Sequence, residues 1–575
     1  MTALVLKKRE VDKDLYRDLV NHKVNKLIAK LLAARNVKGV EEYNLRYEDK
    51  LPYTQMKNLD KMVAILLEAI KTGKKLLILS DYDADGGTAC VIGYTCLKAF
   101  GANVGYLIPK RLVQGYGLTK DIAEIACSEA YKPDYIITVD NGISSFEGID
   151  YCNSQGVKVL VTDHHQAGAT LPNAEVIVNP NQPGCEFGSK ALAGCGVIFY
   201  VMWALQDALV EEGMTFADPS FEVDQVLPIL TVGTIADVVP LDVNNRILVK
   251  AGLERIWKGK CSEGLKALIK LAGKRLNSLT TMDIAFQIGP RINAAGRLET
   301  MDKGVECLLC EEPGRAMELA LSLQSQNESR KEIEAQVSAQ AAATLEEVGD
   351  LSEEKNAYTI AVANDGWHQG VVGIVAGRLK EKHWRPTFVF TSMGCEPGEM
   401  KGSGRCIEGM NLRDALDEVS KLVPGVLLKF GGHAMAAGAT IAADKFEEFK
   451  AAFETVARKH LSEDHLSQVI PVDGKLPVEF YNIADIAYMK EYPWGQLFPA
   501  PTFCDIFDIK RQKLISDGKH LKLTVTKEGK QFDAVVWRQP ELLKSDSVKA
   551  VFKLDVQEFR GESSVQIIIE HIIPD

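Results

Sequence analysis

A closely spaced set of carboxylates follows an apolar run near residue 80. Residues 76–88 read LLILSDYDADGGT, which places Asp81, Asp83 and Asp85 before a glycine pair. Carboxylates this close repel one another at neutral pH unless a cation or strong hydrogen-bond donors compensate them. The spacing therefore predicts a site for a hard divalent metal ion. An EF-hand calcium loop is not expected, because its twelfth position would be Ile92 rather than Glu.

Three more polar sites follow apolar runs farther along the chain. Helix-like stretches separate the first three runs, which predicts an α/β fold with a doubly wound parallel sheet. Parallel strands bring their C-terminal ends to one edge of the sheet, where ligands bind. This rule predicts that Asp83, Asp85, Asp140 and His164 meet at that edge. The further sites are Asp140, the run Asp163-His164-His165, and Asp237.

The residue types at this edge indicate both the metal and the reaction. Carboxylates with one imidazole and no cysteine suit Mn²⁺ or Mg²⁺, whereas a closed zinc site would favour thiolates. Five or more such ligands exceed what one ion needs. Two ions about 3.5–4 Å apart, bridged by a carboxylate, are therefore predicted, and this arrangement serves displacement at phosphorus. We expect phosphoester hydrolysis.

At these residues the sequence resembles the DHH phosphoesterases, a family named after an Asp-His-His run that stands here at 163–165. The motifs DYDADG, ITVDNGI, TDHH and GTIADVVPL follow the family order in the first half of the chain. The motifs GPRINAAGR, WHQGVVGI, GSGR and FGGHAMAAG continue it toward the C-terminus. This set resembles the bacterial branch of the family that degrades single-stranded DNA from its 5′ end.

The resemblance assigns roles at the predicted metal site. It implies that Asp140 bridges the two ions and that His165 lies beside the scissile phosphate. One ion would be held by Asp85, His164 and Asp237, and the other by Asp83.

Three neighbouring positions carry their own expectations. Asp163 is a candidate catalytic residue that we expect to orient His164 or cap the following turn, rather than to bind metal, since ligating histidines usually contact a carboxylate. Asp81 is a second candidate, with an N-cap or a satisfied turn residue as the alternative. Leu79 stands where related pyrophosphatases have a histidine, so we expect the second ion to be weakly held and filled mainly with substrate.

Substrate contacts are predicted from basic and small residues beside the motifs. A Gly/Ser turn ending in Arg405 would offer a guanidinium, a hydroxyl and backbone N–H groups to one phosphate. The resemblance associates this loop with the 5′-phosphate, and an ordinary surface turn is the alternative. Small residues after His433 would allow close approach to substrate, with a packed helix start as the alternative. The predicted substrate-binding residues are Arg111, Tyr116, Arg291, Arg297, Ser403, Arg405 and His433.

Composition and length fit a large enzyme of several domains. The 575 residues carry a formal charge of −11, which is a weak guide because positive charge can be local. No apolar run of 18 residues and no basic, apolar leader is visible, so no membrane span is expected and a cytoplasmic location is predicted. The 12 cysteines are scattered and form no zinc motif.

The chain divides into five predicted parts. Residues 312–348 are expected to form one long connecting helix, with a helical hairpin as the alternative. Alternating short runs near the C-terminus predict a small β-barrel of the oligonucleotide-binding type. The parts are an N-terminal extension (1–50), the DHH catalytic domain (51–265), connecting helices (266–350), a second α/β lobe (351–462) and the barrel (463–575).

The predicted function is a metal-dependent exonuclease of DNA repair and recombination that releases mononucleotides from the 5′ end of single-stranded DNA. The alternatives are a DHH phosphodiesterase for oligonucleotides or cyclic dinucleotides, and a non-catalytic replication scaffold. The resemblance also suggests a single-strand-binding protein and a recombination helicase as partners, and a monomer is expected. Polarity and the preference for DNA depend on the resemblance alone.

Overall fold

The strand and helix pattern of the first half builds a five-stranded parallel sheet. The computed structural model describes residues 4–35, 37–109, 117–347, 357–559 and 562–573. Each neighbouring pair in the order β3-β2-β4-β5-β6 is parallel, as the sequence predicts. The strands are β2 (Lys75–Ser80), β3 (Asn103–Leu107), β4 (Tyr135–Val139), β5 (Lys158–Thr162) and β6 (Val176–Val178).

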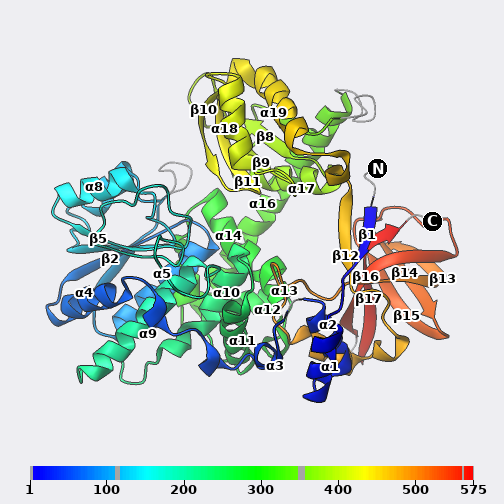
Figure 1. The fold of residues 1–575 in the computed structure, drawn as a ribbon, viewed down its shortest axis with the longest axis horizontal. Coiled ribbons are helices and arrows are strands. Elements are labelled where there is room, and N and C mark those ends of the chain that lie inside the picture. Colours follow the sequence, from blue (N-terminus) through cyan, green and yellow to red (C-terminus); the bar gives the residue numbers. More distant parts are fainter. Residues whose placement is uncertain (1–3, 36, 110–116, 348–356, 560–561, 574–575) are drawn as a thin grey trace. The chain divides into compact units, whose positions relative to one another are not determined.

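Helices cover both faces of this sheet (Figure 1). Successive side chains of a strand point to opposite faces. In β2, Leu76 and Ile78 therefore pack with the helices of one face, and Leu77 and Leu79 with those of the other. The strand reads as a continuous apolar run because neither of its faces meets water. The first face carries α5 (Ala84–Ala99) and α9 (Gly194–Glu211), and the second carries α7 (Lys120–Ala126) and α8 (Phe146–Ser154).

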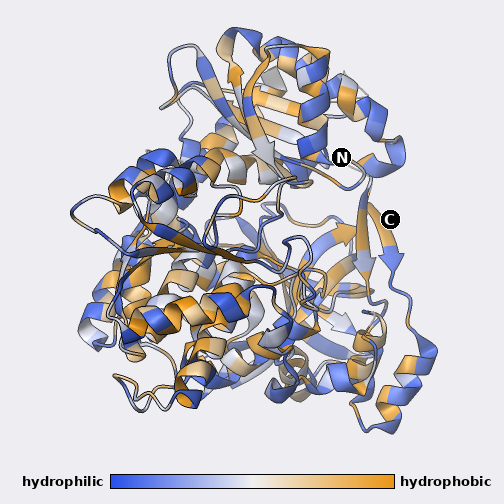
Figure 2. Cartoon of the chain, turned by 60° about the vertical axis from the view of Figure 1, so that its left-hand side comes forward, coloured by the Kyte–Doolittle hydropathy of each residue, from blue (hydrophilic) through white to orange (hydrophobic). Residues whose placement is uncertain are grey.

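Helix α9 is buried in this layer. Among the described helices it is the one long and apolar enough to cross a membrane by length and composition. However, 72% of its apolar window is buried inside the protein. Surface helices in Figure 2 show hydrophilic and hydrophobic stretches side by side, as expected for helices with one buried face. We therefore describe α9 as a core helix.

Helices then lead to a single long helix. α16 (Pro313–Glu347) has 35 residues, which confirms the predicted connector and excludes the hairpin. It passes from one of two compact units to the other: Arg9–Asn327 with Asp473–Asp575, and Met1–Lys8 with Glu328–Val472. Other helices of this region are α10 (Leu227–Asp237), α11 (Val243–Trp257), α12 (Glu263–Leu271), α14 (Gly289–Leu298) and α15 (Asp302–Leu309).

The C-terminal segment forms a closed five-stranded barrel in the order β13-β14-β15-β17-β16. The strand-like runs at 521–525, 532–537, 550–556 and 565–573 predict its last four strands, but no such run predicts β13. In β13, Asp505 is buried beside the inward-facing Phe503 and Phe507, and it forms an ion pair with Lys527 at 2.6 Å. Because a charged residue occupies an inward position, the sequence of β13 does not show the alternation of apolar and polar residues that is typical of a strand. The strands are β13 (Phe503–Ile515), β14 (His520–Lys527), β15 (Lys530–Val536), β16 (Ser547–Phe559) and β17 (Glu562–Ile573).

The second unit contains a mixed sheet in the order β10-β11-β9-β8-β7. Its GSGR motif lies in a strand, so the predicted Gly/Ser turn and its surface-turn alternative are both wrong. Gly402 and Gly404 face aromatic rings, and a Cβ at either position would lie 2.3–2.4 Å from Phe390 or Phe388. These glycines therefore serve close strand packing. The strands are β7 (Ile360–Ala363), β8 (Thr387–Thr391), β9 (Glu399–Arg405), β10 (Leu427–Gly432) and β11 (Ala436–Ala442).

The two ends of this unit pair with each other. β1 (Leu4–Lys8) lies parallel to β12 (Gln468–Val472) over five residues. The segment after β1 contains α1 (Lys13–Asn21) and α2 (Lys26–Ala33). The N-terminal extension is thus structured, and its first strand is completed by a segment near the barrel in sequence.

Candidate metal centre

The ends of three parallel strands deliver acidic and imidazole side chains to one edge of the sheet. Asp81 follows β2, Asp140 follows β4, and the Asp163-His164-His165 run follows β5. Asp237 comes from a different kind of element, because it is the last residue of helix α10. His164 Nε2 lies 3.1 Å from Asp140 Oδ1 and 3.7 Å from Asp237 Oδ2. The edge rule thus brings Asp140 and His164 together, and the end of helix α10 adds Asp237.

Three overlapping groups of these side chains have ligand atoms within 4.8 Å of one another. Asp140 belongs to two of the groups, one containing carboxylates only and one containing both histidines. This central position is what the predicted bridging role requires. The groups are Asp81, Asp83 and Asp140; Asp85, His164 and Asp237; and Asp140, His164 and His165.

The starts of α5 and α9 hold the last two carboxylates of the DYDADG loop, Asp83 and Asp85. Asp83 is the N-cap, and its carboxylate accepts hydrogen bonds from the N–H groups of Asp85 and Gly86 at 2.9 and 3.1 Å. The N-cap alternative for Asp81 is therefore wrong, since Asp83 has that position. Asp85 accepts from the N–H groups of Gly194 and Cys195 at 2.6 and 2.9 Å. The N-terminus of α9 thus holds the carboxylate in place.

Asp140 approaches the backbone so closely that only glycine fits beside it. A Cβ at Gly194 would lie 2.5 Å from the Asp140 Cβ atom. Asp140 itself has a φ of +61°, a left-handed conformation that non-glycine residues rarely adopt. Such strain occurs often at functional sites. Gly194 could not be singled out from the sequence, although the run of small residues Ala193-Gly194-Cys195-Gly196 is compatible with close packing.

The electrostatics of the centre require a cation. Burial, then the charges of Asp85 and Asp83, raise the pKa of Asp140 well above its usual range, and burial followed by the same two charges does so for Asp237. Burial also lowers the pKa of His164. Asp140 Oδ1 and His164 Nε2 are buried and have no hydrogen-bond partner among the described residues. A divalent ion would satisfy both atoms, so the residues fit the predicted metals.

Asp163 and His165 form a hydrogen-bonded pair within the cluster. The Asp163 carboxylate accepts from the N–H groups of Ile143, His164 and His165, and lies 2.7 Å from the Nδ1 atom of His165. Burial alone would lower the pKa of His165, but the hydrogen bond and charge of Asp163 outweigh it and raise the pKa to about 9. We predicted that Asp163 orients His164 or caps the following turn, and its bonds to the backbone N–H groups of His164 and His165 agree with the second alternative. The imidazole that it holds is instead that of His165.

Two asparagines that the sequence reasoning missed support the histidine loop. The side chain of Asn179 donates to the carbonyl of His165 at 2.9 Å, and that of Asn181 donates to the carbonyl of His164 at 2.6 Å. They follow β6 in the run Asn179-Pro180-Asn181. Polar residues after a short apolar run were the available signal, because β6 ends at the same sheet edge as β5.

The predicted substrate-binding residues are distributed over several elements. Arg291 is buried in α14, where it donates to Gln324 Oε1 at 2.6 Å, and Arg297 lies in the last turn of that helix. In the second unit, Ser403 and Arg405 lie on β9, with Arg405 Nη1 3.1 Å from Ser403 Oγ. His433 is exposed in the turn between β10 and β11. Arg111 and Tyr116 lie outside the described residues.

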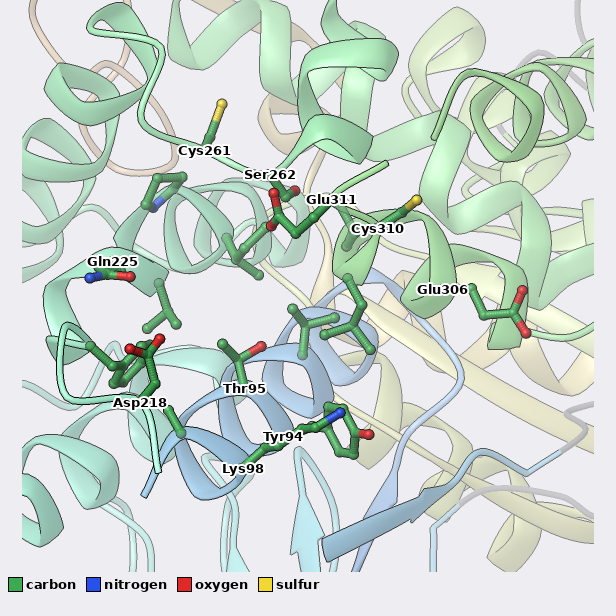
Figure 3. A pocket seen from close by; sticks show the side chains of 18 of the residues that line it. Tyr94, Thr95, Lys98, Asp218, Gln225, Cys261, Ser262, Glu306, Cys310 and Glu311 are labelled. Carbon is green, nitrogen blue, oxygen red and sulfur yellow. The ribbon is translucent and has the colours of Figure 1, made fainter. Parts of the chain in front are cut away.

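The protein also contains a pocket whose lining differs in chemistry from the metal centre. It encloses about 840 Å³ along the C-terminal half of α5, and its lining includes Tyr94, Lys98, Cys261 and Glu311 (Figure 3). None of the metal-site residues above lines this pocket. Size therefore does not identify the reactive centre, which is defined by buried charge at the sheet edge.

Models of known protein families match three separate parts of the chain. Family models match at residues 75–234 (DHH family, N-terminal domain), 355–459 (DHHA1 domain) and 472–571 (RecJ OB domain). The single-stranded-DNA-specific exonuclease RecJ of Escherichia coli is 40% identical over 583 residues, which cover 99% of each chain. This chain belongs to the RecJ family.

Other RecJ proteins agree with this assignment. The RecJ of Bacillus subtilis is 32% identical over 97% of this chain and 69% of its own length. A crystal structure of RecJ in complex with Mn²⁺ from Thermus thermophilus superposes with a TM-score of 0.80, at 27% identity, and covers all of this chain and 80% of that one. The Mg²⁺ complex of the same protein gives a TM-score of 0.75. The fold is that of RecJ, with a DHH sheet, a second α/β lobe and a terminal barrel.

Proposed function

We propose that this protein is a metal-dependent exonuclease that degrades single-stranded DNA from its 5′ end to mononucleotides. The observation that carries the proposal is the intact cluster around Asp140, in which a buried carboxylate oxygen and a buried imidazole nitrogen lack hydrogen-bond partners among the described residues. A family member that had lost catalysis would gain nothing from buried, uncompensated carboxylates that destabilise the folded state. We also propose that the protein acts in DNA repair and recombination.

Mn²⁺ or Mg²⁺, two ions in all, would be held by Asp83, Asp85, Asp140, His164 and Asp237. When bound, such ions supply Lewis-acid assistance and a more acidic water for hydrolysis of a phosphodiester. The protein's part is to keep the ligands in place through the N-terminus of α9 and the N-cap of α5. Because Leu79 is a buried core residue rather than a histidine, we propose that the ion near Asp83 is the weaker of the two.

His165 would act directly on the substrate. In the metal-free protein the hydrogen bond and charge of Asp163 raise the pKa of His165 to about 9 and so favour the protonated imidazole, and Asp163 fixes the ring through Nδ1. A positive charge held in this way stabilises negative charge that develops on a phosphoryl oxygen. Asp163 is then a positioning residue, and Asp81 is proposed as a further carboxylate of the metal site.

The remaining assignments are part of the same proposal. The substrate strand would contact Arg291 and Arg297, and its 5′-phosphate would bind at Ser403 and Arg405 with His433 nearby, while Arg111 and Tyr116 would follow its path. We keep the five predicted parts of the chain. We also propose a cytoplasmic monomer that works with a single-strand-binding protein and a recombination helicase.

The test uses one oligonucleotide labelled in parallel at its 5′ or 3′ end. The purified protein is incubated with single strands or a blunt duplex, in Mn²⁺, Mg²⁺ or EDTA. Early release of the 5′-labelled mononucleotide, only from single strands and only with metal, is expected. Early release of the 3′ label would overturn the polarity. Retained binding without cleavage would favour the scaffold alternative, and cleavage restricted to very short substrates would favour the oligonucleotide phosphodiesterase.

A further inference from the structure

Three bulky apolar side chains project into solvent around a groove next to the metal centre. The groove encloses about 440 Å³, and its lining is largely apolar. Val238, Phe286 and Leu497 are 59%, 67% and 76% exposed. Val238 and Phe286 line the groove, and Leu497 follows its lining residue Gln496. An exposed apolar cluster of this kind usually marks a binding surface.

The backbone at each of these three residues is unusual. Val238 and Leu497 have φ values of +65° and +56°, a left-handed conformation that is unfavourable for bulky side chains and most of all for a β-branched one. Phe286 lies in a π-helix, Ile284–Ile288, a rare element that often occurs at functional sites. Strained residues persist only where the surrounding structure holds them, and they cluster at ligand sites. Two kinds of uncommon backbone conformation, left-handed φ and a π-helix, therefore occur on three separate segments around one groove.

The groove borders the metal centre at the C-terminal end of helix α10. Its wall includes residues 234–236 and 238–239, which flank the proposed ligand Asp237 on both sides. The opposite wall is anchored to this region, because Thr281 Oγ1 donates to the carbonyl of Trp494 at 2.6 Å. A strand held with a phosphate at the metal centre would therefore have its adjacent bases within reach of the groove.

We propose that this groove binds unpaired nucleobases of the substrate strand next to the scissile phosphate, with Phe286 as the stacking surface and Val238 and Leu497 as its apolar margins. The inference rests on the proposed exonuclease function. Bases stack on aromatic side chains with little regard to sequence, which suits an enzyme that degrades any single strand. In a duplex the base faces are already stacked on neighbouring bases, and the base edges are paired. The groove therefore contributes to the selection of single strands.

The experiment removes the contact from the protein and from the DNA separately. Phe286→Ala is compared with the wild type on an oligonucleotide with bases and on one that carries abasic sites near its 5′ end. The control Val210→Ala shortens an exposed apolar side chain (62% exposed) on α9, away from the groove lining. Phe286→Trp tests whether another aromatic ring restores the contact.

Phe286→Ala should raise KM about tenfold on the strand with bases and leave kcat within about twofold, as expected for the loss of one stacking contact. On the abasic strand the wild type and Phe286→Ala should differ by less than about twofold. Phe286→Trp and Val210→Ala should both behave like the wild type on both strands. Equal losses on the two strands, or no change in KM, would overturn the proposal.

Two other outcomes also count against the groove as a base site. A change in oligomeric state of Phe286→Ala in solution would assign the patch to contact between copies of the chain. A failure of Phe286→Trp to restore KM would assign Phe286 to local packing. If the wild type itself does not cleave single strands, the proposed function fails, and this result is distinct from a normal enzyme that is insensitive to Phe286.

Discussion

Two clusters of buried charge in the same unit of the protein solve the problem of desolvation in opposite ways. The carboxylate of Asp473 receives both terminal nitrogens of Arg35 at 2.9 Å, Arg9 at 3.2 Å and the N–H group of Thr502 at 2.9 Å. The side chains of Arg35 and Asp473 are only 1% and 2% exposed. Every charge in this cluster has a partner from the chain itself.

The metal centre has carboxylates in excess and leaves Asp140 Oδ1 and His164 Nε2 without hydrogen-bond partners among the described residues. The fold therefore completes one charged cluster and leaves the other for an external ion. A buried charge is stable only when it is paired. Buried ligand atoms without a hydrogen-bond partner in the described part of the chain therefore distinguish the reactive cluster from the structural one.

The largest effect is expected for Asp140→Ala, which should lower the rate of DNA hydrolysis at least about a thousandfold. The midpoint of unfolding in EDTA should not fall, because the substitution removes a buried carboxylate that has no compensating charge. A nuclease assay and thermal unfolding measure the two effects. Asp60→Ala, an exposed position on α4 (Leu59–Lys71), is the matched control. Substantial remaining activity would contradict the bridging assignment.

The opposite pattern is expected for Asp473→Ala. The substitution leaves Arg35 and Arg9 buried without their carboxylate, so the free energy of unfolding should fall by about 3–5 kcal/mol. Urea unfolding measures it, and added Mn²⁺ should not selectively restore the loss. A decrease of less than about 1 kcal/mol would show that the arginines find other partners and that the cluster is not self-contained.

A smaller effect is expected when Mn²⁺ is added to the metal-free wild type. An ion that binds only the folded state stabilises it by about 2.7 kcal/mol at a hundredfold excess over its Kd. The rise in Tm should disappear in Asp140→Ala and persist in Asp473→Asn. An equal rise in wild type and Asp140→Ala would locate the ion elsewhere.

The smallest effect concerns pH in the absence of metal. Burial, with the charges of Asp85 and Asp83, raises the pKa of Asp140 and of Asp237 in the folded state. A raised carboxyl pKa contributes stability below the ordinary value near 4, and this contribution is lost as the pH rises through the raised values. Wild-type stability in EDTA should therefore decline relative to Asp140→Asn, on the order of 1 kcal/mol per pH unit within that window. A constant difference between the two proteins across this range would contradict the assignment.

From the sequence alone, strand ends and motif spacing predict which acidic and imidazole side chains meet at the sheet edge. The apolar runs before Asp81, Asp140 and Asp163 are buried parallel strands, and the geometry of a parallel sheet brings their ends together. The donors that fix Asp85 could not be predicted, because Gly194 and Cys195 lie more than 100 residues farther along the chain. Their role depends on how α9 packs against α5.

Local composition misled the prediction where packing decides the conformation. The glycines of GSGR suggest a turn, yet rings of Phe388 and Phe390 require glycine at the facing positions of strand β9. Likewise, β13 was missed because the inward-facing Asp505 is compensated by Lys527, a residue of the next strand. In both cases the deciding partner is remote in sequence, so a window of neighbouring residues contains no sign of it.

The pairing of β1 with β12 has a consequence for synthesis of the chain. Leu4 and its partner Gln468 are separated by 464 positions, and so is every other pair in this short parallel ladder. At about 5–20 residues per second, the partner strand leaves the ribosome roughly 20–90 s after the first one. Throughout that interval β1 lacks β12, the strand with which it pairs. The unit that contains it closes only after residue 472 has been synthesised, when all strands of the parallel sheet have long been available.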